Sequence, residues 1–477
     1  MQVFKFGGAS VKDAEAVKNI RVLLSKQSTK ETVMVVSAMA KTTNALEEVC
    51  KSFKNAAADL ALKVASIKEM HLQIIHDLFA ENNTDLINEI ENVFVELDWI
   101  LEEPPHENTA FIYDQIVSLG EILSTKIIAA YLNYTGLPCI WVDARSYIQT
   151  DNNYQEGTVN WEETSALIQH DFPKLLSDKM IVTQGFIGGT SENFTTTLGR
   201  EGSDYTAAIF AYCLNAESVT IWKDVPGVMN ADPRYFENAR LLNQISYREA
   251  IELAFYGATV IHPKTLQPLQ KKEIPLFVKS FINPTLPGTS VSKGADLDPH
   301  LPCFILKKNQ LLLSLSSIDF SFIMEENISE IFALLHQYKM KVSLIQNSAI
   351  SFSVCIDDKF GNFNSLKSVL SKKFKISYNE NVSLFTIRHF DQKAAQIVEK
   401  NKLVLLKQVS RETMQIINHY EAGLCFEPEN EADFIEKAIL LATNREIYQK
   451  SVKGCEKLAQ DFDRNKIATQ MLKTLEF

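Results

Sequence analysis

The sequence predicts an α/β protein with a largely parallel central sheet, followed by smaller α+β modules and a helical C-terminal extension. Its start places a short apolar strand, QVFKF, before an amphipathic helix and a second apolar strand, ETVMVVSA, and this βαβ order implies parallel strands. Similar strands recur, separated mostly by helical stretches, at LPCIWVDA, KMIVTQGFI, SVTIWKDV and IPLFVKSF. Beyond residue 302 the order becomes β-α-β-β-α-β, which is typical of a ferredoxin-like module.

These elements divide the chain into five segments. Residues 1–285 form one large α/β domain, with a glycine-poor helical insertion from Thr42 to Leu101. A stretch rich in proline and glycine, residues 286–302, predicts a linker. Residues 303–380 predict a complete ferredoxin-like module and residues 381–417 a partial repeat, which lacks a second helix and a fourth strand. Residues 418–477 are rich in Ala, Glu, Lys and Leu and predict a helical extension.

Composition excludes several classes of function. The net charge of −11 disfavours binding to nucleic acid or to an anionic membrane surface. Seven cysteines without a C-x-x-C pair, and nine histidines without an H-x-x-x-H pair, predict no protein-ligated metal. The scattered cysteines, the charged residues that interrupt the first twenty positions and the lack of a long apolar run together predict a cytoplasmic protein with no membrane segment.

The stretch KFGGAS, Lys5 to Ser10, follows the first strand and precedes a helix that we expect to begin at Val11. Two glycines let the backbone approach an anion closely, and a helix N-terminus favours negative charge. Ser10 with Asp13 predicts an N-cap, and Lys5 would place an ammonium group beside a phosphate. The alternative is a tight strand-to-helix turn with a surface lysine.

A second glycine cluster, TTTLGREGSDYTAA, again lies between an apolar strand and a helix. Arg200 stands between Gly199 and Gly202, so the two clusters together suit a polyanionic substrate on one side and a carboxylate on the other. Asp204 would pair with Lys5 and hold its ammonium group; the alternative is an ordinary acidic residue at a helix start.

A third segment, WKDVPGVMNADPR, follows a strand and contains the turn signals Pro226-Gly227 and Asp232-Pro233. These signals predict a shaped loop, which is able to wrap a nucleotide base, but the motif taken alone favours a plain surface loop.

Seven motifs in this order resemble the aspartate kinase family of the amino-acid kinase superfamily: KFGGAS, VVSAMAKTTN, SLGEILST, TQGFIGG, TTTLGREGSDYTAA, KDVPGVMNADPR and GATVIHPKT. The resemblance covers residues 1–417, because the ferredoxin-like modules resemble the tandem ACT domains of that family. It implies an αβα sandwich that transfers a phosphoryl group from ATP, with Mg²⁺, to the β-carboxylate of L-aspartate. The product would be 4-phospho-L-aspartate, which leads to lysine, threonine and methionine.

Carried over position by position, the resemblance implies roles for individual residues. Lys5 and Asp204 form the catalytic pair. The acceptor is bound by Ser37, Thr43, Glu121, Phe186, Arg200 and Ser203, where Glu121 receives its ammonium group and Arg200 its α-carboxylate. The nucleotide is bound by Lys5, Gly7, Gly8, Ser10, Lys223, Asp224, Met229, Asp232, Arg234, Thr259 and Lys264.

The chain departs from the family pattern in places. Thr259 replaces a lysine that contacts the nucleotide in some members, with Lys264 as a candidate substitute, and Met229 replaces an aromatic residue. Lysine or threonine at an ACT interface and a homodimer or higher homo-oligomer are further implications. Ser343 replaces a recurrent acidic residue there, so the alternative is that the modules serve subunit pairing alone.

Two further alternatives stay open at this point. Another kinase of the same fold, acting on glutamate, N-acetylglutamate, carbamate or UMP, would share the glycine clusters. In a catalytically inactive ACT-type amino-acid sensor, the ACT modules would carry the function, and such a sensor would not need Lys5, Glu121, Arg200 and Asp204. Residues 418–477 fall outside the kinase resemblance and instead resemble the end of a GT-B glycosyltransferase, without the nucleotide-sugar domain that would precede it.

Overall fold

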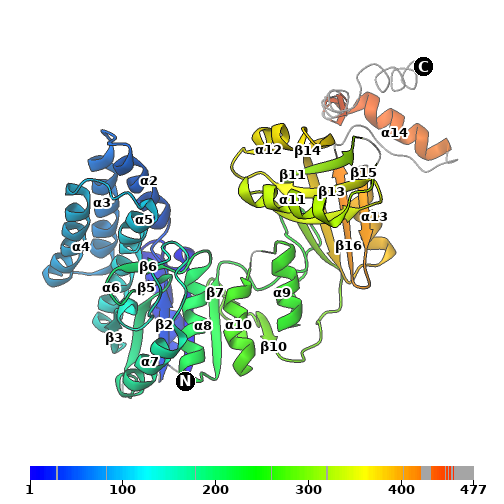
Figure 1. Cartoon of the computed structure of the whole chain (residues 1–477). Helices are drawn as coiled ribbons and strands as arrows, with labels where there is room; N and C mark the ends of the chain where they lie inside the picture. Colours follow the sequence, from blue (N-terminus) through cyan, green and yellow to red (C-terminus); the bar gives the residue numbers. More distant parts are fainter. Residues whose placement is uncertain are drawn as a thin grey trace. The chain divides into compact units, whose positions relative to one another are not determined.

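The computed structural model describes residues 1–419 and 431–455, apart from residues 28, 30, 82, 178, 259, 319, 320, 401, 446, 450, 453 and 454. The chain forms two compact units (Figure 1). The first comprises Met1–Met229 and Arg240–His300, and the second comprises Asn230–Ala239 and the chain from Leu301 onward.

The first unit is built on an eight-stranded sheet in the order β3-β4-β2-β1-β7-β9-β10-β8. Its strands are β1 (Gln2–Phe6), β2 (Thr32–Val36), β3 (Cys139–Val142), β4 (Met180–Gln184), β7 (Ser218–Lys223), β8 (Gln244–Ser246), β9 (Leu276–Ser280) and β10 (Thr289–Ser292). All neighbours run parallel except β9 and β10. Every residue of β2 and of β4 is buried, which explains their continuous apolar runs.

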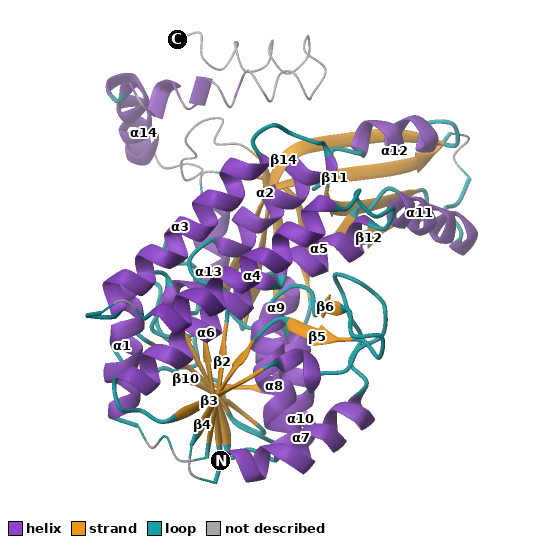
Figure 2. Cartoon of the chain, turned by 90° about the vertical axis from the view of Figure 1, so that its left-hand side faces the viewer, coloured by secondary structure: helices purple, strands orange, loops and turns teal. Residues whose placement is uncertain are grey.

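Helices cover both faces of this sheet, so the predicted αβα sandwich is confirmed. Figure 2 shows α1 (Ala14–Ser25) and α6 (Leu119–Tyr134) on one side, and α7 (Trp161–Leu175), α8 (Gly202–Leu214) and α10 (Pro263–Lys272) on the other. The remaining elements are the turns η1 (Gly8–Val11) and η2 (Ala144–Ser146), the hairpin β5 (Ile187–Gly189) and β6 (Thr195–Thr197), and α9 (Tyr247–Tyr256).

The helical insertion has the predicted place in the chain. It consists of α2 (Thr42–Lys54), α3 (Leu60–Leu78) and α4 (Thr84–Glu102), which pack with α5 (Thr109–Val117) and α6. Residues 109–134 are long and apolar enough to cross a membrane, but 83% of their most apolar window is buried inside the protein. They therefore form a core helical segment of the first unit.

The entry into α1 differs from expectation. The helix does not begin at Val11 with Ser10 as its N-cap: the turn η1 follows the glycines, and α1 begins at Ala14 with Asp13 as the N-cap. The Asp13 carboxylate accepts a hydrogen bond from the Ala16 N–H at 2.8 Å. A three-residue offset results because the backbone after Gly8 closes one tight turn before it enters the α-helix.

The expected linker, residues 286–302, also differs. Part of it is β10, an edge strand that pairs with β8 and β9, and the first unit continues to His300. A strand of four residues between proline-rich turns carries little apolar signal, which is why the pattern indicated a linker.

The second unit is a six-stranded antiparallel sheet in the order β12-β13-β11-β14-β16-β15. Its elements are β11 (Cys303–Ser317), α11 (Glu325–Gln337), β12 (Lys341–Asn347), β13 (Ser351–Asp357), α12 (Phe363–Leu370), β14 (Phe374–Arg388), α13 (Gln392–Glu399), β15 (Leu403–Val409) and β16 (Thr413–His419). Each of the two modules uses one half of β11 and one half of β14.

The long strands supply the fourth strand that the partial repeat was expected to lack. Cys303, at the start of β11, lies opposite Arg388, at the end of β14, whereas Ser317 lies opposite Phe374. The second module therefore has the order β11-β14-β16-β15, and its fourth strand is the first half of β11, which precedes the first module in the chain. The expected boundary at residue 380 falls inside β14, because one continuous strand serves both modules.

A ten-residue segment, Asn230–Ala239, which begins with the last five residues of the third motif, belongs to the second unit. The ring of Phe236 stacks on that of Phe304 with centroids 5.0 Å apart. Asn230 donates from its amide to the Pro302 carbonyl at 2.8 Å and accepts a hydrogen bond from the Phe304 N–H at 2.7 Å. The segment is thus anchored on the start of β11.

Of the expected helical extension, α14 (Glu431–Thr443) is described. Residues 420–430 and 456–477 lie outside the described residues, so the resemblance of this region to a glycosyltransferase stays a prediction.

Candidate active site

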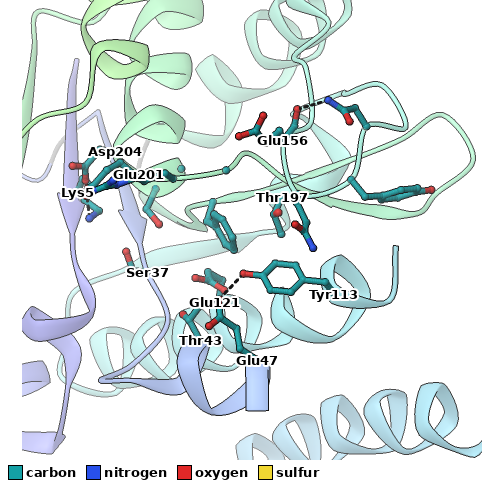
Figure 3. Close-up of a pocket in the computed structure, with 18 residues that line it drawn as sticks. Lys5, Ser37, Thr43, Glu47, Tyr113, Glu121, Glu156, Thr197, Glu201 and Asp204 are labelled. Atoms are coloured by element: carbon teal, nitrogen blue, oxygen red, sulfur yellow. Dashed lines mark hydrogen bonds and ion pairs between the residues drawn. The ribbon is translucent and has the colours of Figure 1, made fainter. Parts of the chain in front are cut away.

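The first unit contains a cavity of about 780 Å³ at the end of its central strands. All eight residues predicted to be catalytic or to bind the acceptor line it: Lys5, Ser37, Thr43, Glu121, Phe186, Arg200, Ser203 and Asp204. Figure 3 shows Ser37 lying between the Lys5–Asp204 pair and Glu121. The two glycine clusters thus converge on one space, although they are about 190 residues apart in the chain.

Parallel strands explain the convergence. Lys5 lies on β1 and Ser37 directly follows β2, its neighbour, so both reach the carboxyl edge of the sheet. Gly8 lets this edge close, because a Cβ there would lie 2.9 Å from the carbonyl oxygens of Ala38 and Ala40. A Cβ on Gly7 would stand 3.3 Å from the Lys5 ammonium group. Gly8 therefore allows the loop to pack closely, and Gly7 leaves space beside the Lys5 ammonium group.

An ion pair forms one end of the cavity. Lys5 Nζ lies 2.7 Å from Asp204 Oδ1, and Lys223 Nζ lies 3.3 Å from Asp204 Oδ2. Burial of Asp204 acts to raise its pKa, but the ammonium groups of Lys5 and Lys223 outweigh it and hold the pKa below its usual value. Lys223 Nζ also lies 3.9 Å from Glu201 Oε2, so two ammonium groups balance two carboxylates in this cluster, and Lys5 is the one of the two lysines that lines the cavity.

Glu121 lies on α6 and is 2% exposed. Its Oε1 accepts a hydrogen bond from the Ala38 N–H at 3.3 Å, while Oε2 has no partner among the described residues. Burial raises the pKa of this carboxyl to about 8. A buried acid with an unsatisfied oxygen at a cavity wall is suited to receive a cationic ligand group.

Arg200 lies in the exposed turn between β6 and α8. Within the described residues it forms no ion pair, so its guanidinium group is available to a carboxylate. Phe186, which lines the same cavity, has a left-handed backbone with φ of 72°. Gly202 accommodates its ring, because a Cβ there would lie 2.6 Å from Phe186 Cδ2.

The structure adds wall residues that the motifs did not identify. The Tyr113 hydroxyl donates to Glu47 Oε1 at 2.8 Å, and burial raises the pKa of Tyr113 (Figure 3). Glu47 is four residues after Thr43 on α2, so helical spacing could have indicated it. Tyr113 had no such signal. Glu156 and Glu201 also line the cavity.

The predicted nucleotide residues are only partly brought together. Lys223 contacts Asp204 and donates to the Val260 carbonyl at 2.5 Å. Lys264 stands near the cavity wall, because a Cβ on Gly199 would lie 3.7 Å from its Nζ. Ser10 has a structural contact instead of a free hydroxyl, since it is 1% exposed and donates to the Trp222 carbonyl at 3.4 Å.

The other members of that set lie elsewhere. Met229 forms an isolated bridge with Leu241, and Asp224 does not line the cavity. Asp232 and Arg234 belong to the second unit, where they pair with each other at 2.6 Å. Thr259 lies outside the described residues.

The model of the amino acid kinase family matches residues 1–280. The lysine-sensitive aspartokinase 3 of Escherichia coli is 32% identical over 356 residues, which span 74% of this chain and 78% of that protein. The chloroplastic aspartokinase 1 of Arabidopsis thaliana is 32% identical over 373 residues, spanning 74% of this chain and 63% of that protein.

Solved structures agree. E. coli aspartokinase III in complex with lysine and aspartate (T-state) superposes with a TM-score of 0.74 and 26% identity, covering 93% of this chain and 100% of that chain. The same enzyme in complex with aspartate and ADP (R-state) gives a TM-score of 0.73, covering 93% and 99%. The chain therefore belongs to the amino acid kinase family and, within it, to the aspartokinases.

Proposed function

We propose that this chain transfers the γ-phosphoryl group of ATP to the β-carboxylate of L-aspartate, giving 4-phospho-L-aspartate and ADP. The observation that carries this proposal is that Lys5 and Asp204, on one side, and Glu121 and Arg200, on the other, line one cavity. Family membership supports the same reaction, because E. coli aspartokinase III was solved in complex with aspartate and ADP.

The acceptor side has complementary charges for aspartate. Glu121 Oε2 would receive the ammonium group of the substrate, and Arg200 would hold its α-carboxylate. Opposed charges at the two ends fix the direction of the substrate, so that its β-carboxylate faces the Lys5 end. Ser37, Thr43, Phe186 and Ser203 would complete the wall around it.

The chemistry at this site is mainly positioning. The β-carboxylate is ionised near pH 7, so the reaction needs no general base. A carboxylate oxygen forms a bond to the γ-phosphorus, the bond from that phosphorus to the bridging oxygen breaks, and ADP leaves with the electron pair. The principal obstacle is the approach of two anions, which the ammonium group of Lys5 counteracts in a partly dry site.

The nucleotide side has a glycine turn and several cations. The missing side chain of Gly7 leaves space beside the Lys5 ammonium group, which fits a phosphate, and Lys223 and Lys264 stand close by. Among the described residues no three His, Cys, Asp or Glu side chains gather in a metal site. We therefore expect Mg²⁺ to arrive bound to the phosphates of ATP, where it would neutralise part of their charge.

The second unit would provide regulation and assembly. We include lysine or threonine as a ligand of the ACT-like modules, supported by the lysine complex of E. coli aspartokinase III. A cavity of about 280 Å³ in the first module is lined by Phe322, Asn327 and Lys373, among others. Among the described residues the edge strands β12 and β15 each pair with one neighbouring strand, and their outer backbone groups suit pairing in a homodimer. Four cysteines in the described part of the chain, Cys50, Cys139, Cys213 and Cys355, form no disulfide and support a cytoplasmic location.

A hydroxylamine-trapping assay tests the reaction directly. Aspartyl hydroxamate should form when ATP, Mg²⁺ and aspartate are present, glutamate or N-acetylglutamate in place of aspartate should give no hydroxamate, and UMP in place of aspartate should release no ADP. The variant Arg200→Met should raise the KM for aspartate with little change for ATP. If aspartate yields no hydroxamate while the protein is folded, the inactive-sensor alternative is favoured instead.

A further inference from the structure

We propose that Asp114 is a positioning residue that holds the Arg200 turn at a fixed distance from Glu121. The helical segment formed by α5 and α6 then sets the spacing of Glu121 and Arg200, which would bind the ammonium group and the α-carboxylate of aspartate. This inference rests on the proposed function, because it assigns Asp114 a role in the same acceptor site.

Asp114 lies on α5, and its carboxylate is completely buried. Its Oδ2 accepts hydrogen bonds from the Gln155 N–H at 2.9 Å and the Thr197 N–H at 2.8 Å. Its Oδ1 accepts a third from the Thr197 hydroxyl at 2.8 Å. Both partners line the cavity, although they are 41 and 83 residues further along the chain. One carboxylate thus ties two separate wall segments to α5.

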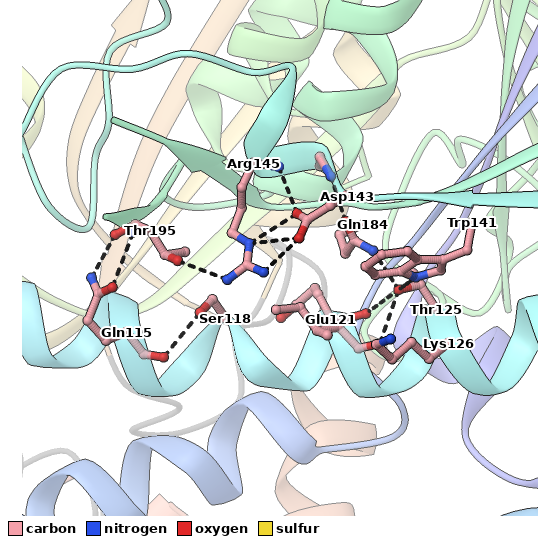
Figure 4. Close-up of polar contacts among 12 residues, drawn as sticks. Gln115, Ser118, Glu121, Thr125, Lys126, Trp141, Asp143, Arg145, Gln184 and Thr195 are labelled. Atoms are coloured by element: carbon pink, nitrogen blue, oxygen red, sulfur yellow. Dashed lines mark hydrogen bonds and ion pairs between the residues drawn. The ribbon is translucent and has the colours of Figure 1, made fainter. Parts of the chain in front are cut away.

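The next residue reinforces this attachment. The Gln115 amide donates to the Thr195 carbonyl at 2.8 Å and accepts from the Thr195 N–H at 3.1 Å, as Figure 4 shows. Asp114 and Gln115 therefore hold both ends of β6. Arg200 is three residues beyond Thr197, so the position of β6 determines where the turn that carries the guanidinium group begins.

The same helical segment carries Glu121. Figure 4 shows Gln115, Ser118 and Glu121 in succession along it. Asp114 lies on α5 and Glu121 on α6, and Ser118, which alone joins the two helices, has a right-handed helical backbone. The seven residues from Asp114 to Glu121 are about two helical turns, so both side chains emerge from one side of the segment. The acid that would receive the ammonium group and the acid that anchors the carboxylate-binding turn therefore share one rigid frame. A displacement of about 1 Å in such a frame can cost on the order of 100-fold in rate.

The chemistry of the three donors distinguishes two substitutions. Asp114→Ala leaves two backbone N–H groups and a hydroxyl without their acceptor, so β6 and the Gln155 loop lose their attachment. Asp114→Asn can keep it, because its amide oxygen can accept from both N–H groups while its NH₂ donates to the Thr197 hydroxyl. A positioning role therefore predicts rescue by Asn and not by Ala.

The full chain should be assayed by hydroxamate formation with aspartate and ATP varied separately. We expect Asp114→Ala to raise the KM for aspartate about tenfold or more and the KM for ATP less than about twofold, and Asp114→Asn to stay within about threefold of the wild type. Asp358→Ala is the matched control, because its carboxylate likewise accepts two backbone N–H groups, from Asn362 and Phe363, but in the second unit. Its kinetics should equal those of the wild type.

Hydrogen–deuterium exchange of residues 195–202 gives a readout independent of activity. Exchange there should be faster in Asp114→Ala than in the wild type or in Asp114→Asn. Should Asp114→Ala not fold, Gln115→Leu tests the same attachment through Thr195, with a smaller change in the same direction. A folded Asp114→Ala protein, or Gln115→Leu in its place, with wild-type KM for aspartate and unchanged exchange would overturn the proposal. An inactive wild type with faster exchange in Asp114→Ala would instead refute the proposed function and leave the positioning role standing.

Discussion

Lys5 Nζ lies 2.7 Å from Asp204 Oδ1 at the closed end of the cavity, and Asp204 is wholly buried. The carboxylate also contacts Lys223, so Asp204 is shared between two ammonium groups while it fixes Lys5 in place. An ammonium group held in this way needs no reorganisation when negative charge develops on a phosphoryl group. This relationship leads to the first prediction.

Lys5→Ala should lower kcat far more than it raises the KM for aspartate. We expect a loss of about 3–4 kcal/mol of transition-state stabilisation, which is about 10²- to 10³-fold in kcat. Steady-state kinetics by hydroxamate trapping measures both constants. Lys12→Ala, which removes an exposed lysine seven residues away, is the control and should behave as the wild type. Equal losses in kcat and in aspartate affinity would contradict the role assigned to Lys5.

The two glycines of the first motif should respond differently to alanine. Gly8→Ala would press on the Ala38 and Ala40 carbonyls, so it should destabilise the fold by about 1–3 kcal/mol. Gly7→Ala would meet only the Lys5 ammonium group, so it should reduce kcat with little change in stability. Chemical denaturation and kinetics on both variants separate the two effects. A loss of stability in Gly7→Ala together with a loss of kcat alone in Gly8→Ala would contradict these two roles.

Much of the site could be predicted because its motifs follow strands. Lys5 lies near the end of β1, Ser37 directly follows the neighbouring parallel strand, and Arg200 and Asp204 flank the start of α8, so their places in the fold bring them to one edge of the sheet. Tyr113 and Asp114 could not be recognised as site residues, because they lie inside an apolar helix with no glycine or charge pattern. Tyr113 contacts Glu47 on another helix, and Asp114 contacts residues 41 and 83 positions further along the chain, so neither contact can be inferred from the local sequence.

The second unit shows a different limit of prediction. The local pattern indicated one complete module and one partial one, because the polar stretches KKNQ in β11 and NEN in β14 divide each long strand into two separate runs. Which half of a long strand pairs with which partner depends on tertiary contacts that no local periodicity records. The same holds for Asp232 and Arg234: their turn-rich segment is held in the second unit by Phe236, through a stacking contact with Phe304 across 68 positions of sequence.

The helical insertion should be sensitive to acid through His71. This side chain is completely buried on α3; its Nδ1 lies 2.8 Å from the Ile67 carbonyl, and its Nε2 has no partner among the described residues. Burial lowers its pKa to about 4. A histidine held neutral contributes stability above its unfolded pKa, near 6.5, and loses that stability as the pH falls toward 4.

The expected loss is about 3 kcal/mol between pH 6.5 and pH 4, measured as the free energy of unfolding by urea. His71→Leu should flatten this dependence. His76→Gln is the control, because His76 lies on the same helix with a side chain that is 76% exposed, and it should retain the wild-type slope. A wild-type slope in His71→Leu would assign the acid sensitivity to other groups.

Aspartate binding should depend on pH through Glu121. In the free enzyme burial raises the pKa of this carboxyl to about 8, so at pH 7 most molecules carry a proton there. The ammonium group of aspartate favours the ionised form, so binding must release that proton. The KM for aspartate should therefore fall as the pH rises from about 6.5 to 8.5, by up to about tenfold per unit below the pKa.

Isothermal titration at pH 7 in two buffers of different ionisation enthalpy should show release of about one proton per site. Glu121→Gln keeps the shape of the side chain but cannot ionise, so it should bind aspartate weakly, with no proton release and a flat profile in this range. If the Gln variant keeps the pH profile of the wild type, the titrating group lies elsewhere and Glu121 does not receive the ammonium group.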